Sequence, residues 1–416
     1  MKRIMSGKKF CRLLRYLHVC SLHQPLGEEY NPSYKVKELL EYLEGRFERL
    51  FTPGRQLSLD ETLIRTFGRI KFKVRIISKA ARYGIKLYVL TDAQTAFVLK
   101  IIIYTGKSTY QPTIDANEKK TVSIVKELCQ HLAGTHRTVF VDRFYTSIEL
   151  MRELKAMDLY LTGTLMKNRI PKEMVIARSS KQFREMKRGD FKRHLYQYRI
   201  GRQTNKAGLV CWKDRDVVYC ISNETDTGTV DICTRRTRDG LIKIDRPRCI
   251  GEYNKYMGGV DLADMRRLHC NSTIMGQNRW WLKLFFYLLD VGTSNALVLH
   301  NYTRSSPMTI VEFKMTLVNG FIGERMRGIP EVIVQHLPTR SDGRYRCAYC
   351  SLFNRMKRTR FRCSAPCCQL PLCSIGTGSA GEDCFTLCHG NKAIHKAVLD
   401  KFESMKKSYT SSNKDV

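Results

Sequence analysis

The chain has 416 residues, which is enough for two or three domains with hydrophobic cores of their own. Its 72 lysines and arginines stand against 39 acidic residues and give a formal charge of +33, an excess that indicates a polyanionic partner. The basic residues are spread along the chain and not confined to one tail. This favours a long DNA track over a ribosomal or heparin-binding type of charge run, or over a merely solvated face.

We expect neither a signal peptide nor a membrane span. Residues 1–3 open a basic segment without the apolar core of a signal peptide. The most apolar stretch, residues 280–299, is interrupted by Lys283, Asp290 and Asn295, whereas a span needs about 20 mostly apolar residues. We therefore expect a buried helix there, no membrane partner, and a soluble intracellular protein. The basic charge points to the nucleus.

The first third of the chain alternates between strand-like and helix-like periods. Helices are expected at residues 8–22, 35–51, 118–133 and 147–157, a strand at 56–65, a hairpin at 84–91 and 96–105, and a buried strand at 137–142. The order β-β-β-α-β-α is that of an RNase H-like core. The fold class is therefore predicted as α/β, with a catalytic core at residues 56–165.

The later segments are expected to interrupt or flank this core. Residues 166–249 are basic, contain strand-like runs, and are predicted as a β-rich insertion domain. Within it, residues 181–193 are either a mobile DNA-facing loop or a solvated charge run. The remaining predicted segments are a helical dimerisation and DNA-binding segment at 1–55, the third part of the core at 250–271, a second helical DNA-binding segment at 272–336, a linker at 337–344, a cysteine-rich module at 345–395 and a basic tail at 396–416, disordered from residue 405.

Four aspartates are the candidate catalytic residues. Asp261 and Asp264 stand three residues apart after Gly258-Gly259, at the expected start of a helix, while Asp60 and Asp142 belong to short β-prone runs. Carboxylates from two strands and one helix suit a pair of Mg²⁺ or Mn²⁺ ions, which prefer oxygen ligands. Two such ions about 4 Å apart activate a water and stabilise the leaving oxygen of a phosphodiester. Acidic residues at strand ends are common, so the aspartates alone are weak support.

Eight of the 16 cysteines lie between Cys347 and Cys388. In a reducing compartment such a cluster indicates metal ligands more readily than disulfides, and thiolates with an imidazole select Zn²⁺ in tetrahedral sites. Nine candidates suffice for two structural zinc ions with one left over, in a pairing that the sequence leaves open. They are Cys347, Cys350, Cys363, Cys367, Cys368, Cys373, Cys384, Cys388 and His389. Cys367 and Cys368 are alternatives for one position, and Cys388 is the least certain.

Six ordered motifs give these residues a context. They are Tyr104-Thr105-Gly106-Lys107, Asp142-Arg143-Phe144-Tyr145-Thr146-Ser147, Leu161-Thr162-Gly163-Thr164, Tyr253-Asn254-Lys255-Tyr256-Met257-Gly258-Gly259-Val260-Asp261, Arg279-Trp280-Trp281 and the cysteine-rich tail. Together they resemble the piggyBac family of transposases, over nearly the whole chain from residue 10 to residue 395.

The resemblance implies specific roles. Asp60, Asp142 and Asp261 would be the catalytic triad with its metal ions, and Asp264 a fourth acidic residue at the metal site. Trp280 would stack on an unpaired base near a transposon end, with Arg279 and Lys255 beside it on DNA, whereas Trp281 suits a core position at least as well. Double-stranded DNA with TTAA targets and a homodimer are implied in the same way.

The chain departs from the family pattern in three places. It begins inside the helical domain at Arg15-Tyr16-Leu17-His18, so we expect an N-terminal part to be missing. The segment Ile77-Ser78-Lys79-Ala80 stands where the family has Asn-Lys-Pro, and Met265 follows Asp264 directly where a Gln is usual.

Two functions from different classes remain open. One is an active strand-transferring nuclease that cuts at transposon ends through hairpins. The other is a domesticated DNA-binding protein with a relic site. All four aspartates favour the first, and the short N-terminus favours the second. The charge argues against a third option, a zinc-dependent protein-interaction module on an inert scaffold.

Overall fold

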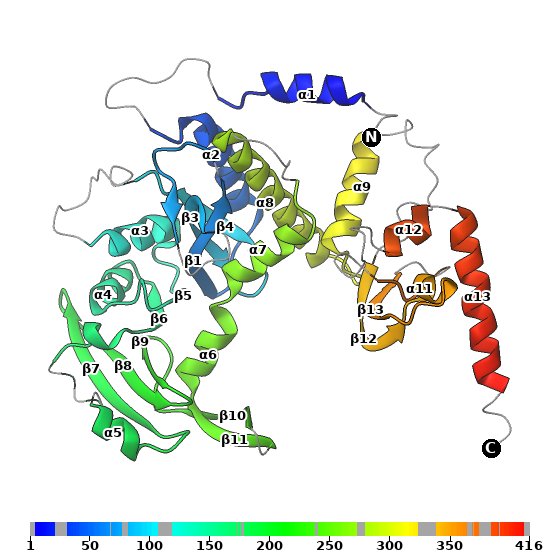
Figure 1. Ribbon diagram of the computed structural model, residues 1–416. Coiled ribbons are helices and arrows are strands. Elements are labelled where there is room, and N and C mark those ends of the chain that lie inside the picture. The colour runs from blue at the N-terminus through cyan, green and yellow to red at the C-terminus, as the bar shows by residue number, and fades with distance from the viewer. Residues whose placement is uncertain are drawn as a thin grey trace. The chain divides into compact units, whose positions relative to one another are not determined.

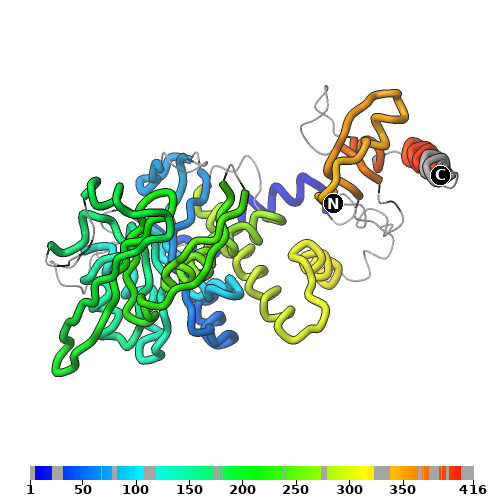
Figure 2. Tube along the Cα trace, turned by 90° about the horizontal axis from the view of Figure 1, so that it is seen from below, coloured from blue at the N-terminus to red at the C-terminus, as the bar shows by residue number. Residues whose placement is uncertain are grey.

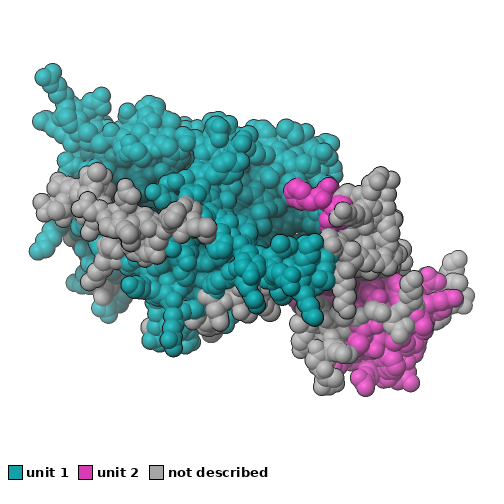
Figure 3. Space-filling view, turned by 90° about the horizontal axis from the view of Figure 1, so that it is seen from above, with its two compact units in different colours: residues 1–318 teal, residues 319–416 magenta. Residues whose placement is uncertain are grey.

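The computed structural model describes residues 5–20, 31–66, 68–76, 82–106, 119–172, 174, 176, 179–237, 240–272, 279–322, 338–363, 368, 370–373, 384–390 and 392–411. Two compact units divide the chain, Met1–Val318 and Asn319–Val416 (Figure 3). Each is described by itself. The predicted boundary at residue 337 thus differs from the observed one.

The first unit is built on one mixed sheet of nine strands. Its path runs β2-β3-β1-β5-β6-β9-β8-β7, with β4 paired to β3. The strands are β1 (Gln56–Arg65), β2 (Val74–Arg75), β3 (Tyr83–Asp92), β4 (Val98–Ile103), β5 (Thr138–Val141), β6 (Tyr160–Thr164), β7 (Phe191–Ile200), β8 (Gln203–Lys213) and β9 (Val217–Ser222). β1 is antiparallel to β3 and parallel to β5. The predicted strand at 56–65 and the predicted hairpin are confirmed.

Helices cover both faces of the central strands. They are α1 (Gly7–Tyr16), α2 (Tyr34–Leu50), α3 (Lys120–Cys129), α4 (Ile148–Ala156), α5 (Ser180–Glu185), α6 (Arg248–Tyr256), α7 (Gly259–His269), α8 (Trp280–Tyr302) and α9 (Ile310–Ile322), with short 3-10 turns at Gln130–Leu132 and Lys167–Arg169. In Figure 1, α3 and α4 lie on one side of β1, and α7 and α8 lie on the other. Ser147 begins α4 because its hydroxyl accepts the N–H of Leu150.

The segment 166–249 is not a separate β domain. β9 pairs with β6, so β7, β8 and β9 extend the central sheet. Only β10 (Val230–Thr237) and β11 (Gly240–Pro247) form a hairpin of their own, which packs Cys233 and Ile244 against Trp212. The predicted loop at 181–193 is also wrong. Ser179 and Gln182 form a capping box that starts α5, and β7 begins at Phe191.

The helix α8 packs against α2 and β4 (Figure 2). Its length and composition alone would suit a membrane crossing, which is weak support because core helices share both properties, and 50% of its most apolar window is buried. Its buried polar residues have partners within the protein. Asn295 accepts from the N–H of Val98 and donates to the carbonyl of Val98, and Asp290 forms an ion pair of 2.5 Å with Lys314.

The edge strand β4 has a second polar contact. Glu44 on α2 accepts the N–H of Ile101 at 2.8 Å. Burial raises the pKa of Glu44 to about 7, with the hydrogen bond and Lys100 acting in the opposite direction. Side chains of α2 and α8 therefore occupy backbone groups that an edge strand would otherwise offer to another chain.

The second unit is small and contains most of the clustered cysteines. Its elements are β12 (Pro338–Arg346), α11 (Ala348–Leu352), β13 (Arg358–Cys363), α12 (Cys384–Gly390) and α13 (Lys392–Ser411). The predicted linker at 337–344 is wrong from Pro338 onward because β12 pairs with β13. The tail expected to be disordered from 405 is helical to Ser411, since Ile394, Val398 and Phe402 pack on the cysteine core; residues 412–416 lie outside the described residues.

Candidate functional site

The register between β1 and β5 brings Asp60 and Asp142 to neighbouring positions. Leu59 pairs with Val141 in the parallel ladder, and the two aspartates are the next residues. Adjacent strands lie about 4.8 Å apart. Two residues earlier, Ser58 donates to the carbonyl of Met257 at 2.5 Å, and Phe140 contacts Tyr256 with ring centroids 5.3 Å apart. Because strand side chains alternate with a period of two, both aspartates face the side that α6 and α7 cover.

The helix α7 approaches this face because it begins at a glycine. A Cβ on Gly259 would lie 2.6 Å from Thr91 Oγ1 and 2.8 Å from Ser58 Cβ, so a larger residue would push the helix away. Further along, the hydroxyl of Thr62 donates to the carboxylate of Asp264. Contacts at Ser58 and Thr62 thus bracket Asp60 on the strand, and Asp261 lies on the exposed flank of α7 between the matching positions 257 and 264.

Asp264 is held from two sides. In addition to Thr62, Arg267 contacts its Oδ1 at 3.2 Å, and this guanidinium lies 4.7 Å from the centre of the Tyr287 ring. The carboxylate is therefore fixed by its own helix, by β1 and, through Arg267, by α8.

The site carries a concentrated negative charge. Burial raises the pKa of Asp142 and the nearby Glu61 adds to the rise, while hydrogen bonds from the N–H groups of Phe144 and Tyr145 oppose it. Burial also raises the pKa of Tyr253 to about 12, and the charges of Asp142 and Asp60 contribute to that rise. Glu61 points to the opposite face of β1, where it pairs with Lys86.

The carboxylates do not form a tight ligand group. Among the described residues, two sets of three or more potential ligand atoms lie within 4.8 Å of one another, and both consist of cysteine and histidine residues of the second unit. The four aspartates share one face of the sheet without being such a set. Their role as metal ligands stays a prediction.

The three predicted DNA-binding residues have different surroundings. Arg279 donates to the carbonyl of Leu14 at 2.6 Å and to that of Arg15 at 3.2 Å, so it holds the end of α1. Trp280 is half-buried and meets Phe72 edge-on, with ring centroids 5.2 Å apart. Lys255 is exposed, with its Nζ 4.8 Å from the centre of the Tyr256 ring. Their contact with DNA stays a prediction.

The cysteine-rich unit contains both ligand sets. Cys347, Cys350, Cys373 and Cys384 form the first, and Cys363, Cys368 and His389 form the second. Cys388 is buried but belongs to neither set, and Cys367 lies outside the described residues, as does the segment Ile77-Ser78-Lys79-Ala80.

Sequence reasoning missed His395. Its Nε2 lies 3.4 Å from Cys368 Sγ, while His389 Nε2 lies 3.5 Å from the same sulfur. His389-x5-His395 has the separation of paired imidazole ligands, at the upper limit of the usual three to five intervening residues. That spacing was the available signal, and the second set gains a fourth candidate ligand from it.

Comparison with known proteins decides the family. A family model described as Transposase IS4 matches residues 1–297. The chain belongs to the piggyBac-type transposase family. It is 26% identical over 352 residues to human PiggyBac transposable element-derived protein 3, covering 79% of the chain and 56% of that relative. It is 22% identical over 335 residues to human PiggyBac transposable element-derived protein 2, covering 76% and 55%.

A solved structure shares the fold of this family member. The cryo-EM structure of a piggyBac transposase synaptic complex with hairpin DNA matches with a TM-score of 0.64 and 22% identity, over 82% of this chain and 70% of that chain. The mixed α/β fold with a large mixed sheet is therefore shared. The chain spans about half the length of the two human relatives, at 56% and 55%.

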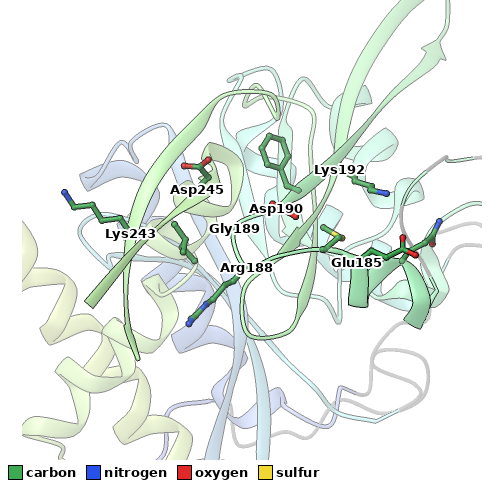
Figure 4. Close-up of a pocket in the computed structure, with 11 residues that line it drawn as sticks. Glu185, Arg188, Gly189, Asp190, Lys192, Lys243 and Asp245 are labelled. Atoms are coloured by element: carbon green, nitrogen blue, oxygen red, sulfur yellow. The ribbon is translucent and has the colours of Figure 1, made fainter. Parts of the chain in front are cut away.

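A pocket of about 570 Å³ lies away from the aspartates, between α5, the start of β7 and β11 (Figure 4). Three cationic side chains and three carboxylates line it: Arg188, Lys192, Lys243, Glu185, Asp190 and Asp245. The two signs balance, so the pocket has no preference for a charged ligand of either kind.

Proposed function

We propose that this chain is a DDD-type DNA transposase with an RNase H-like core, which cleaves and transfers DNA strands at transposon ends. The observation that carries this proposal is the register of β1 and β5. It puts Asp60 beside Asp142, on the face where α7 contributes Asp261 and Asp264. Membership of the transposase family supports the same activity.

The donor set fits a hard divalent cation. Asp60, Asp142 and Asp261 offer carboxylate oxygens from two strands and one helix, which suits Mg²⁺ or Mn²⁺ better than softer metals. The charges that raise the pKa of Tyr253 belong to two of these residues, so a cation would relieve their mutual repulsion. When bound, two such ions would supply water activation and charge stabilisation at the phosphodiester.

The protein's own groups orient these carboxylates. The N–H groups of Phe144 and Tyr145 donate to Asp142 Oδ1 at 2.9 and 3.4 Å and direct its side chain. Thr62 and Arg267 hold Asp264. Because Asp264 already has these partners, its part in the proposal is to support the site next to Asp261.

The substrate of the proposed reaction is double-stranded DNA. The formal charge of +33 suits phosphate contacts along an extended surface. The related solved complex contains hairpin DNA, and the family resemblance adds TTAA targets, a homodimer and a nuclear location. Arg279, Trp280 and Lys255 are the proposed contacts near the transposon end.

The second unit is proposed to hold two structural Zn²⁺ ions. Cys347, Cys350, Cys373 and Cys384 would hold the first, since four thiolates within 4.8 Å of one another are a closed tetrahedral donor set. Cys363, Cys368, His389 and His395 would hold the second. Metal binding would then stabilise a unit whose core consists largely of these same cysteines.

A domesticated DNA-binding protein is the second candidate. The ion pair between Asp264 and Arg267 favours it, because a cation neutralises part of the acidic cluster without any metal. The human relatives also carry names that describe them as transposable element-derived.

Incubation of the purified protein with an end-containing duplex and Mg²⁺ separates these candidates. Nicks or hairpins are expected, and Asp60→Asn, Asp142→Asn or Asp261→Asn should each abolish them while leaving DNA binding roughly unchanged. Glu61→Gln is the matched control, because it removes a neighbouring carboxylate on the opposite face of β1. DNA binding without cleavage by the unaltered protein would favour the domesticated alternative.

A further inference from the structure

A cavity of about 300 Å³ lies where α2 and α8 begin, away from the four aspartates. Three segments that are distant in sequence line it. They are His18, Val19 and Cys20 after α1, Tyr34 and Lys35 at the start of α2, and Arg279 and Trp281 at the start of α8. The volume is at the lower end of the range for small-ligand sites, and one nucleotide unit fits that range.

The cavity has a positive electrostatic character. Lys35 and Arg279 contribute two cations and His18 an imidazole, and none of the described lining residues is acidic. Both helices that begin here lack an acidic residue in the first turn, and neither has a side-chain cap. The positive ends of two helix dipoles thus add to the side-chain charges. An anionic group is the ligand that this environment favours.

The guanidinium of Arg279 is positioned before any ligand arrives. Its two terminal nitrogens donate to the carbonyls of Leu14 and Arg15, and its Cζ lies 5.4 Å from the centre of the Trp281 ring. A fixed cation loses little conformational entropy when it contacts a phosphate. Lys35 is half-buried in contrast to the exposed Lys37 of the same helix.

Aromatic rings stand beside these cations. Trp281 is 7% exposed and lies parallel to the His18 ring, with centroids 6.5 Å apart. Tyr34 lies next to Lys35, whose Nζ is 5.8 Å from the centre of its ring. Cations with aromatic faces are the combination that binds a phosphate and the base attached to it. Trp280 belongs to a different contact, because its ring meets Phe72.

We propose that this cavity binds one nucleotide unit of a DNA strand, with its phosphate at Lys35 and Arg279 and its base against Trp281 and Tyr34. The inference rests on the proposed function for the presence of DNA. It adds a second DNA contact that depends on none of the catalytic aspartates.

The test compares Lys35→Gln with Lys37→Gln. Both substitutions remove one positive charge from α2, but Lys37 is exposed and pairs with Glu41 at 3.8 Å. DNA affinity is measured between about 50 and 200 mM salt, where the slope of log K against log salt falls by roughly 0.9 for each duplex phosphate that the protein no longer neutralises. Lys35→Gln should lower the slope by about that amount, Lys35→Arg should restore it, and Lys37→Gln should match the unaltered protein.

A second measurement locates the base. Ultraviolet crosslinking to DNA that contains 5-iodouracil should give adducts on peptides with Tyr34 or Trp281. Equal slopes for Lys35→Gln and Lys37→Gln, with crosslinks elsewhere, would overturn the inference. Binding of thymidine monophosphate that Lys35→Gln abolishes, with an unchanged DNA slope, would also overturn it in favour of a free nucleotide. An unaltered protein that binds no DNA would instead count against the proposed function.

Discussion

The hydroxyl of Thr62 on β1 donates a hydrogen bond to the carboxylate of Asp264 on α7, across 202 positions of sequence. The bond ties the strand that carries Asp60 to the helix that carries Asp261. The placement of the third aspartate therefore depends on a side chain that is not itself a candidate ligand.

Replacing Thr62 by Val should destabilise the first unit. The exchange keeps the branched shape and removes the donor, and a hydrogen bond to a charged group contributes roughly 1.5–3 kcal/mol. Thr62→Ser keeps the hydroxyl and is the control. Urea unfolding should show a lower midpoint for Val than for Ser, and equal midpoints would show that the bond contributes nothing.

Glu44 should make stability depend on pH. Its pKa is about 7 in the folded protein against an ordinary value of 4.5, so the folded state binds the proton more tightly. The resulting stability is fully present below pH 4.5 and is lost as the pH rises through 7, by roughly 1.4 kcal/mol for each unit of difference. Glu44→Gln keeps an acceptor for Ile101 and should remove this dependence.

Unfolding measurements at pH 5 and pH 8 check this expectation. Glu41→Gln, at an exposed position of the same helix, should retain the loss of stability between the two pH values. The same pH dependence in both variants would contradict the role assigned to Glu44.

Lys314→Met should be among the most destabilising single changes in the first unit. Asp290 is fully buried and also accepts from the N–H and hydroxyl of Ser272. Removing its cation leaves a buried charge, which costs about 3–5 kcal/mol. Asp290→Asn combined with Lys314→Met should recover part of the loss in denaturant unfolding. A double variant less stable than Lys314→Met would contradict this account.

Metal analysis of the full chain should find about two zinc ions, and His395→Ala should reduce the number to about one. Cys388→Ser should leave two, because Cys388 belongs to neither ligand set. Chelation should expose residues 338–411 to protease before the first unit. Two zinc ions in the His395→Ala protein would remove His395 from the second site.

Local patterns were sufficient for the central part of the fold. The strand at 56–65 and the following hairpin alternate in ways that the chain itself displays, and β1 and β3 occupy these positions. The buried character of residues 280–299 was also readable. The roles of Asn295 and Asp290 were not, because their partners are Val98 and Lys314, which no local pattern connects to them.

The errors have a common physical origin. Residues 181–193 and 338–344 were predicted as loop and linker from their polar composition, yet both contain strands whose partners lie further along the chain. His395 was missed because it lies beyond the last cysteine of the cluster, whereas α13 brings its imidazole to Cys368. Among the aspartates, the pairing of β1 with β5 supplies what the sequence could not, the neighbouring positions of Asp60 and Asp142.

The pairing of β6 with β9 also determines how this protein can be shortened. Thr162, Gly163 and Thr164 pair with Ser222, Ile221 and Cys220, so the core strand β6 is an interior strand only while residues 166–249 are present. A product lacking that segment would display β6 as a bare edge, ready to pair with other chains. We expect such a product to aggregate, and the core and its insertion to unfold together in one cooperative transition.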